Sequence, residues 1–240
     1  MFFATSASAQ DHSFLTNHNE KINYAFGQDI VATFKEQEFE VDLNAFLAGM
    51  KDAVAGKPAL TPDQQKAALK ELYDLLTARG EVRWKAAAVK NLKDAQDFLA
   101  ENAKQPDVKV KAVTAPDGSK AELQYKILKS GPTGPSPKST DVVEMHYVGS
   151  RLDGTVFDSS VKRGFPATFD VKVMIPAWTE AVQMMKAGDK WQLFVPPQLA
   201  YGEFPPPGIG PNSALIFEIE LLSFYTPKET ATTNAPAKGR

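Results

Sequence analysis

The sequence predicts an α+β protein: an all-helical N-terminal domain with a long connecting helix, followed by an antiparallel β-sheet domain with one short helix packed on it. Two observations lead to this prediction. Between residues 17 and 104, apolar side chains recur every three or four positions, the spacing of one helix face. After Pro106 they alternate with polar ones, as along a half-buried strand. Helices followed by strands are typical of α+β proteins or of separate domains.

The composition is that of an ordinary globular protein, and it excludes several classes of function. The 240 residues are 43% hydrophobic and 23% charged, enough for one large domain or two modest ones. A net charge of -2 gives no basic field for nucleic acid. No run approaches the roughly 18 apolar residues of a membrane span. Because there is no cysteine, disulfides, zinc–thiolate sites and thiol catalysis are excluded.

The first nine residues, MFFATSASA, look like the end of a secretory signal. Ala7-Ser8-Ala9 has the small-x-small pattern that precedes cleavage. The apolar stretch is short and no Lys or Arg precedes it, so a frayed N-terminus is the alternative. A signal remnant at residues 1–9 predicts a periplasmic protein, with cytoplasmic and outer-membrane or cell-surface locations as alternatives. A basic n-region encoded in frame upstream of Met1 would decide the question.

Two amphipathic helices are predicted first. Residues 17–36 carry Ile22, Phe26 and Ile30 at i, i+4 and i+8, which places them on one face of a helix. A second helix is predicted to begin after Asp42, a good N-cap, and to end at the Gly56-Lys57-Pro58 segment.

A helix of roughly 40 residues is predicted next, at residues 62–104, with a length of about 60 Å. Thr61-Pro62-Asp63 supplies a capping hydroxyl, a proline in the first turn and an acid at the positive end of the helix dipole. No further proline occurs before Pro106. Gly80 costs about 1 kcal/mol relative to alanine, so a bend or break there is the alternative.

The long helix suggests a role for the N-terminal domain. A helix that extends beyond a globular body needs another chain to cover its apolar stripe. Residues 10–104 are therefore predicted to form a dimerisation domain. The alternative is a compact three-helix domain in which the long helix packs back on the first two.

Strands and turns follow as far as Phe224. The hairpin at residues 142–158 is the clearest unit, because an Asp-Gly pair in the Leu152-Asp153-Gly154 turn joins strands rich in Val, Tyr and Phe. The other strands are predicted at residues 108–112, 123–127, 167–171, 190–195 and 214–224, the short helix at 177–185 and a long loop at 196–213. The tail at residues 226–240 is predicted to be disordered, because it is rich in Thr, Ala, Pro and Lys.

None of the common catalytic motifs occurs in the sequence. There is no supported Ser-His-Asp arrangement, no H-E-x-x-H, no G-x-G-x-x-G and no P-loop, so neither metal nor cofactor is expected. His146, beside Tyr147 in a predicted strand, is interpreted as a hydrogen-bonded structural residue. What remains is a set of aromatic side chains in the second domain. Taken singly, each is more typical of a core than of a site.

Several motifs of the second domain identify a resemblance. They are Val143-x-Met145-His146-Tyr147-x-Gly149, Leu152-Asp153-Gly154-x-x-Phe157-Asp158-Ser159-Ser160, Met174-Ile175-Pro176-Ala177-Trp178, Val195-Pro196, Leu199-Ala200-Tyr201-Gly202 and Leu215-Ile216-Phe217-x-Ile219. Through them, residues 107–225 resemble the FKBP-type peptidyl-prolyl cis-trans isomerases. The helical region resembles the dimerisation domain of the Mip/FkpA-like subfamily, through Tyr24-x-x-Gly27-x-Asp29 and Asn91-Leu92-Lys93.

The resemblance implies an FKBP-like fold, in which the sheet wraps around the short helix, and an enzyme that accelerates rotation about X–Pro bonds in folding proteins. Rotation about an amide breaks no bond, which explains why no nucleophile was found. The implied catalytic residues are Tyr147, Phe157, Asp158, Trp178 and Tyr201, and the implied substrate-binding residues are Arg163, Phe169, Met174, Ile175, Ile209 and Phe217.

The family pattern also implies a role for individual side chains. Trp178 would form the floor of a proline pocket. Asp158, held by Tyr147 and Arg163, would present its carboxylate to the reacting carbonyl. The Tyr201 hydroxyl and the Ile175 amide would bind neighbouring carbonyls, and Ile209 would close the rim.

The partners implied are proline-containing unfolded or partly folded proteins, a second copy of the chain and macrolide inhibitors of the FK506 type, with accessory chaperone activity. The alternative function is a non-catalytic holdase or interaction module that binds unfolded or prolyl segments. Ala177 favours this alternative, because it stands where the family usually has glycine and an extra methyl group beside Trp178 could crowd the pocket.

Overall fold

The computed structural model describes residue 13 and residues 15–227. The predicted signal remnant at residues 1–9 and nearly all of the predicted disordered tail lie outside the described residues. The chain divides into two compact units, one up to Arg83 and one from Trp84 onward. Within the described part of the chain, no helix is both long and apolar enough to cross a membrane.

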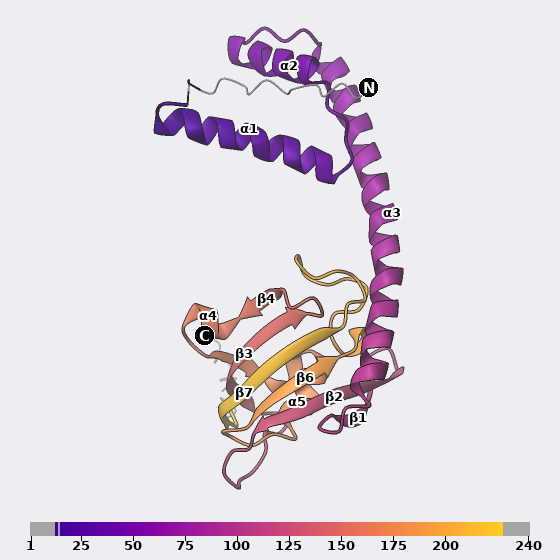
Figure 1. Cartoon of the computed structure of the whole chain (residues 1–240), viewed down its shortest axis with the longest axis vertical. Helices are drawn as coiled ribbons and strands as arrows, with labels where there is room; N and C mark the ends of the chain where they lie inside the picture. Colours follow the sequence, from indigo (N-terminus) through magenta and orange to yellow (C-terminus); the bar gives the residue numbers. More distant parts are fainter. Residues whose placement is uncertain (1–12, 14, 228–240) are drawn as a thin grey trace, which may run out of the picture. The chain divides into compact units, whose positions relative to one another are not determined.

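The predicted helices of the first unit are present, and their caps are those that the sequence indicates. They are α1 (His18–Glu36), α2 (Leu43–Ala55) and the first part of α3 (Pro62–Asn102) (Figure 1). The Asp42 carboxylate accepts hydrogen bonds from the backbone N–H groups of the first turn of α2. Gly56, in the left-handed conformation at φ +65°, ends that helix.

The long helix is continuous, so the predicted single helix is confirmed and Gly80 does not break it. Its start is a capping box: the Thr61 hydroxyl accepts from the Gln64 N–H at 3.3 Å, and the Gln64 side chain accepts from the Thr61 N–H at 2.9 Å. Within the first unit, Arg83 donates to the backbone oxygen of Glu36 at 2.9 Å. This contact places a positive charge at the negative end of α1.

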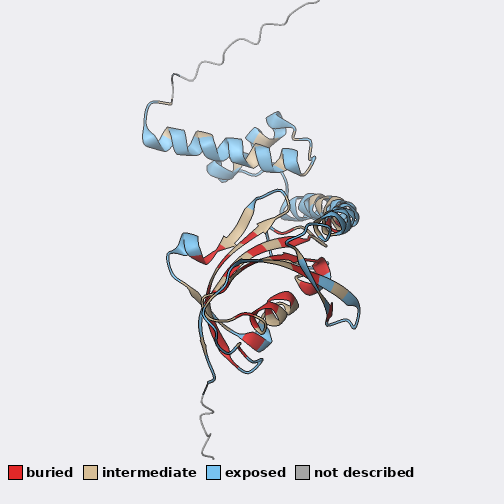
Figure 2. Ribbon diagram, turned by 60° about the horizontal axis from the view of Figure 1, so that its bottom comes forward, coloured by how far each residue is buried: buried red, intermediate tan, exposed pale blue. Residues whose placement is uncertain are grey.

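Much of the apolar surface of α1 and α2 remains exposed in the single chain, although Phe34 of α1 packs against Phe46 of α2 with ring centroids 6.2 Å apart. No residue of either helix is buried, and Figure 2 draws both helices in pale blue and tan without red. Phe26 on α1 and Leu43 on α2 are 63% and 55% exposed. The dimerisation domain and its compact three-helix alternative both stay predictions.

The second unit is built on one antiparallel sheet. Its strands are β1 (Lys109–Thr114), β2 (Lys120–Lys129), β3 (Val142–Arg151), β4 (Val156–Ser159), β5 (Ala167–Asp170), β6 (Lys190–Val195) and β7 (Leu215–Tyr225). The strand order is β1-β2-β6-β7-β3-β4; β4 pairs with the last part of β3 and β5 pairs with its first part, at residues 142–145. The predicted α+β architecture and its antiparallel pairing are confirmed.

The sheet curls around the short helix α5 (Pro176–Val182), which lies on its concave side (Figures 1 and 2). Ala177, Trp178, Ala181 and Val182 of this helix are all buried, and they form the core together with side chains of β3, β6 and β7. The helix ends three residues earlier than the predicted Met185. Three shorter elements were not predicted: α4 (Ser160–Arg163), η1 (Val171–Val173) and η2 (Pro197–Leu199).

The C-terminal part of α3 packs on the sheet of the second unit. Ala95 is buried there at 1% exposure. Gln124 of β2 donates to the Leu99 carbonyl at 2.9 Å, and Asn102 donates to the Gln124 side chain at 2.8 Å. These bonds fix the last turns of α3 to β2, an association between segments that periodicity in the sequence does not report.

Candidate active site

Four aromatic rings cluster with the indole of Trp178 on the concave side of the sheet. Three of them contact the indole directly, and the fourth contacts one of those three. Trp178 meets Tyr147, Phe169 and Phe217 edge to face, with ring centroids 5.0, 5.6 and 5.1 Å apart. Phe157 meets Phe217 at 5.8 Å with the ring planes at 90°. Edge-to-face contacts of this kind contribute about 0.5–1.5 kcal/mol each beyond burial. The rings therefore hold one another in place.

The backbone of β3 brings two of these rings together at Gly149. Gly149 is paired with Asp158 of β4 on one side and with Phe217 of β7 on the other. A Cβ atom at this position would lie 2.7 Å from Cζ of Phe157 and 2.8 Å from Cε1 of Phe217. Glycine is needed here because the two rings occupy the space of a side chain.

We expect Gly149→Ala to displace both rings, lowering the free energy of unfolding by about 1–3 kcal/mol and kcat/KM by about tenfold. Thermal unfolding and an assay of the X–Pro rotation that the resemblance implies measure the two effects. Gly134→Ala is the control, because a Cβ there meets nothing within 4 Å. Wild-type kcat/KM in the Gly149→Ala variant would show that these rings do not shape the site.

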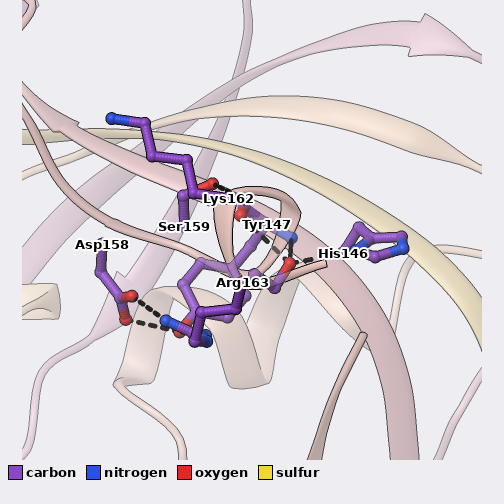
Figure 3. A network of polar contacts seen from close by, with 7 residues as sticks. His146, Tyr147, Asp158, Ser159, Lys162 and Arg163 are labelled. Carbon is purple, nitrogen blue, oxygen red and sulfur yellow. Dashed lines mark hydrogen bonds and ion pairs between the residues drawn. The ribbon is translucent and has the colours of Figure 1, made fainter. Parts of the chain in front are cut away.

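A carboxylate is held at the edge of the aromatic cluster. The Tyr147 hydroxyl donates to Oδ2 of Asp158 at 2.5 Å, and Arg163 of α4 donates to Oδ1 of the same carboxylate (Figure 3). Arg163 also donates to the Tyr147 hydroxyl oxygen at 2.8 Å. The four-residue helix α4 turns Arg163 toward Asp158, and Ser159 caps it by accepting from the Lys162 N–H at 3.1 Å.

This network sets the charge of the site. Burial raises the pKa of Asp158, but the hydrogen bonds from Tyr147 and Arg163 outweigh burial and keep this pKa below its ordinary value of 3.8. Burial, and then the hydrogen bond to Asp158, raise the pKa of Tyr147 above 10.0. At neutral pH the site therefore presents one ionised carboxylate beside a protonated phenol.

Tyr201 and Ile175 offer hydrogen-bond donors that nothing else uses. Among the described residues, neither the Tyr201 hydroxyl nor the Ile175 backbone N–H has an acceptor. Burial, followed by the negative charge of Asp158, raises the pKa of Tyr201, so its hydroxyl keeps its proton. Two donors are thus available to carbonyl groups of a bound peptide.

These side chains line one cavity of about 280 Å³. Nine of the predicted site residues do so: Tyr147, Phe157, Asp158, Phe169, Met174, Ile175, Trp178, Tyr201 and Phe217. The cavity is close to the lower end of ligand-site volumes, roughly 300 Å³. It has room for a prolyl residue and its amide.

Comparison with known proteins agrees with this geometry. Residues 134–222 match the family model "FKBP-type peptidyl-prolyl cis-trans isomerase", and residues 19–127 match "Domain amino terminal to FKBP-type peptidyl-prolyl isomerase". The "Outer membrane protein MIP" of Legionella longbeachae is 40% identical over 92% of this chain and 91% of its own length. The chain belongs to the FKBP-type peptidyl-prolyl cis-trans isomerase family.

Further relatives support the same assignment. The "FKBP-type 22 kDa peptidyl-prolyl cis-trans isomerase" of Escherichia coli is 39% identical over 83% of this chain and 92% of its own length. The crystal structure of FkpA from Escherichia coli superposes with a TM-score of 0.64 at 32% identity, covering 88% of this chain and 98% of that one. The protein is an FKBP-type peptidyl-prolyl isomerase with an N-terminal helical region.

Two predicted site residues do not line the cavity of this FKBP domain. Arg163 contacts Asp158 and Tyr147 from outside the cavity. Ile209 is only 7% exposed and packs into the hydrophobic core, so its place at the rim stays a prediction. His146 hydrogen-bonds through Nδ1 with the Ser160 hydroxyl at 3.1 Å, in keeping with its interpretation as a structural residue.

One cavity residue was missed. Val173, in the short helix η1, lines the cavity although its side chain is 70% exposed. It lies between Phe169 and Met174, so proximity in the sequence was the only signal that could have identified it.

Ala177 bears on the holdase alternative. Its side chain is fully buried in the core of the FKBP domain and does not line the cavity. The extra methyl group therefore lies beneath the cavity wall and does not crowd the cavity. Ala177 in place of glycine thus no longer favours a non-catalytic module.

Proposed function

We propose that this isomerase lowers the barrier to X–Pro rotation by binding the twisted amide in the aromatic cavity. The uncatalysed barrier is about 18–20 kcal/mol, because rotation removes amide resonance. If the site binds the twisted amide more tightly than the planar one by about 1.4 kcal/mol, the rate increases about tenfold. The observation that carries the proposal is an apolar cavity with a single ionised carboxylate at its edge.

The twisted amide differs from the planar one in polarity. Without resonance, its carbonyl oxygen carries less negative charge. The oxygen therefore loses less hydration free energy when it leaves water for a cavity walled by Trp178 and Phe217. The Asp158 carboxylate repels the oxygen of the planar amide more strongly than that of the twisted one, for the same reason. We assign Tyr147, Phe157, Asp158, Trp178 and Tyr201 to catalysis on this basis.

The remaining residues would bind and orient the peptide. The Ile175 N–H and the Tyr201 hydroxyl would each donate to a substrate carbonyl, and holding both fixes the X–Pro amide against Trp178. The substrate-binding role extends to Arg163, Phe169, Met174, Ile209 and Phe217, with Arg163 acting through Asp158.

This mechanism needs no proton transfer, so kcat/KM should not vary between about pH 5 and about pH 9. The titratable residues lining the cavity are Tyr147, Asp158 and Tyr201. The pKa of Asp158 is lowered and those of the two tyrosines are raised, so none of the three titrates in that window. NMR exchange of a Leu-Pro peptide measures the profile without a coupling protease.

Below about pH 5, the protonation of Asp158 determines how stability and activity change with pH. The pKa of Asp158 is lower in the folded protein than in the unfolded chain. Its ionised carboxylate therefore contributes fully to stability at pH values above the unfolded-state pKa, and this contribution is lost as pH falls through the folded-state pKa. Activity should fall in the same range, below about pH 4. A bell-shaped profile between about pH 5 and about pH 9 would instead assign proton transfer to the reaction.

We propose that residues 10–104 form a dimerisation domain. The support is the exposed apolar surface of α1 and α2, which includes Phe26 and Leu43. Light scattering of the full chain at micromolar concentration should give about twice the 26.2 kDa of one chain. Phe26→Ser should shift the mass toward one chain, whereas Asn19→Ser, a polar control on α1, should not. A monomer in the wild type would contradict the proposal.

The same helices suggest accessory chaperone action on unfolded proteins, because exposed apolar patches bind the apolar segments that unfolded chains expose. We further propose that the protein works in the periplasm or envelope, with the name of the Legionella longbeachae relative as support. Macrolides of the FK506 type would occupy the same cavity and compete with the peptide.

A further inference from the structure

A second depression adjoins the isomerase cavity and shares a wall with it. It has a volume of about 350 Å³ and lies between the turn that joins β1 to β2, the helix η2 and the segment that follows η2. Tyr201 lines both this depression and the isomerase cavity. A chain that crosses Tyr201 therefore passes from one to the other.

The floor of the second depression is fixed by backbone hydrogen bonds. The Gly202 N–H donates to the Pro197 carbonyl at 3.0 Å, and the Asn212 N–H donates to the Gly202 carbonyl at 2.8 Å. On the opposite side, the Ser119 N–H donates to the Asp117 carboxylate at 2.8 Å. The depression is therefore preformed, so a chain bound there would not have to order it.

The charged residues that line the depression all carry the same sign. Asp117 and Glu203 line it, and no Lys or Arg does. Among the described residues, neither carboxylate is in an ion pair. Hydrogen bonds from Ser119 lower the pKa of Asp117, which is ionised at neutral pH. The occupant that complements two unpaired carboxylates carries positive charge.

We propose that this depression is an extended substrate subsite that favours a lysine or arginine near the isomerised proline. The proposal rests on the proposed function, because it places the X–Pro bond in the neighbouring cavity. A polypeptide substrate continues on both sides of its proline and needs a surface on which to lie. Glu203 follows Tyr201 by two residues, so their Cα atoms are at most about 7 Å apart, and the basic residue would be roughly two to four positions from the proline.

The test uses the full chain and peptides with a common Leu-Pro core. Each peptide carries Lys, Gln or Glu two, three or four residues from the proline, on its N-terminal or C-terminal side. At low ionic strength, kcat/KM for the Lys peptide should exceed that for the Glu peptide by about fivefold on one side of the proline. The difference should largely disappear at about 1 M salt, where the Debye length is about 3 Å.

Variants locate the effect. The double variant Asp117→Asn with Glu203→Gln should abolish the preference, and Asn retains the acceptor for the Ser119 N–H. The double variant Glu122→Gln with Glu144→Gln is the control, because it also removes two negative charges, one from β2 and one from β3, both outside the depression. Equal kcat/KM for Lys and Glu peptides at every position would overturn the subsite, as would a preference that survives in the double variant. Failure to accelerate the Gln peptide would count against the proposed function instead.

Discussion

Trp178→Leu should reduce kcat/KM for a short Leu-Pro peptide by roughly 10- to 100-fold, or about 1.4–2.8 kcal/mol of transition-state stabilisation. Trp178 contacts three of the other rings, and its own side chain is only 6% exposed. Leucine is smaller than tryptophan and is not planar, so the surrounding rings lose contacts and, in the proposed mechanism, the twisted amide does too. Loss of a large buried side chain should also cost about 2–4 kcal/mol of folding free energy.

Because of that cost, a matched control is needed to separate activity from stability. Trp191 of β6 is 4% exposed in the same core, stacks on Tyr125 at 4.6 Å and does not line the cavity. Trp191→Leu should therefore lower stability by a similar amount, while the protein that remains folded keeps its kcat/KM. Equal losses of kcat/KM in both variants would mean that Trp178 has only a structural role.

Asp158→Ala should reduce kcat/KM by about tenfold or more. The alanine removes the carboxylate and leaves the Tyr147 hydroxyl and Arg163 without their shared acceptor. Asp158→Asn distinguishes the two effects, since the amide oxygen still accepts a hydrogen bond but the charge is gone. If the charge repels the planar carbonyl, the Asn variant should be nearly as slow as the Ala variant.

The control for this prediction is Asp153→Asn. Asp153 lies in the turn of the same hairpin, where it accepts from the Thr155 N–H at 2.9 Å, and it does not line the cavity. The substitution makes the same change in net charge and should leave kcat/KM unchanged. Recovery of wild-type activity in Asp158→Asn would show that the hydrogen bonds, and not the charge, are what the reaction requires.

Local features of the sequence predicted much of the fold. The caps at Asp42 and Thr61 involve only neighbours two or three residues away, so the residue types alone identify them. The hairpin turn at Asp153-Gly154 is local for the same reason, and Gly154 adopts φ +82° there. In these cases the physical cause lies within a few residues of its effect.

What the sequence could not predict depends on contacts between distant segments. The periodicity of the sequence could not decide whether Phe157 is a core residue or a cavity residue. In the structure Phe157 is partly buried, packs on Phe217 and lines the cavity. Asn91 on α3 donates to the Pro211 carbonyl at 2.8 Å, a contact across 120 positions that no local pattern encodes. The four-residue helix that turns Arg163 to Asp158 is too short for a periodic signal.

The central claim is that the aromatic cavity accelerates X–Pro rotation by itself, without cofactor or proton transfer. The most direct test is the cis-to-trans rate of a short Phe-Pro or Leu-Pro peptide with the full-length protein, measured beside buffer and beside the Trp178→Leu variant. Uncatalysed rotation takes about 10–100 s. We predict a rate that increases in proportion to wild-type protein and that falls by at least about tenfold with Trp178→Leu. A wild-type rate equal to that in buffer, or an equal acceleration by the variant, would contradict the claim.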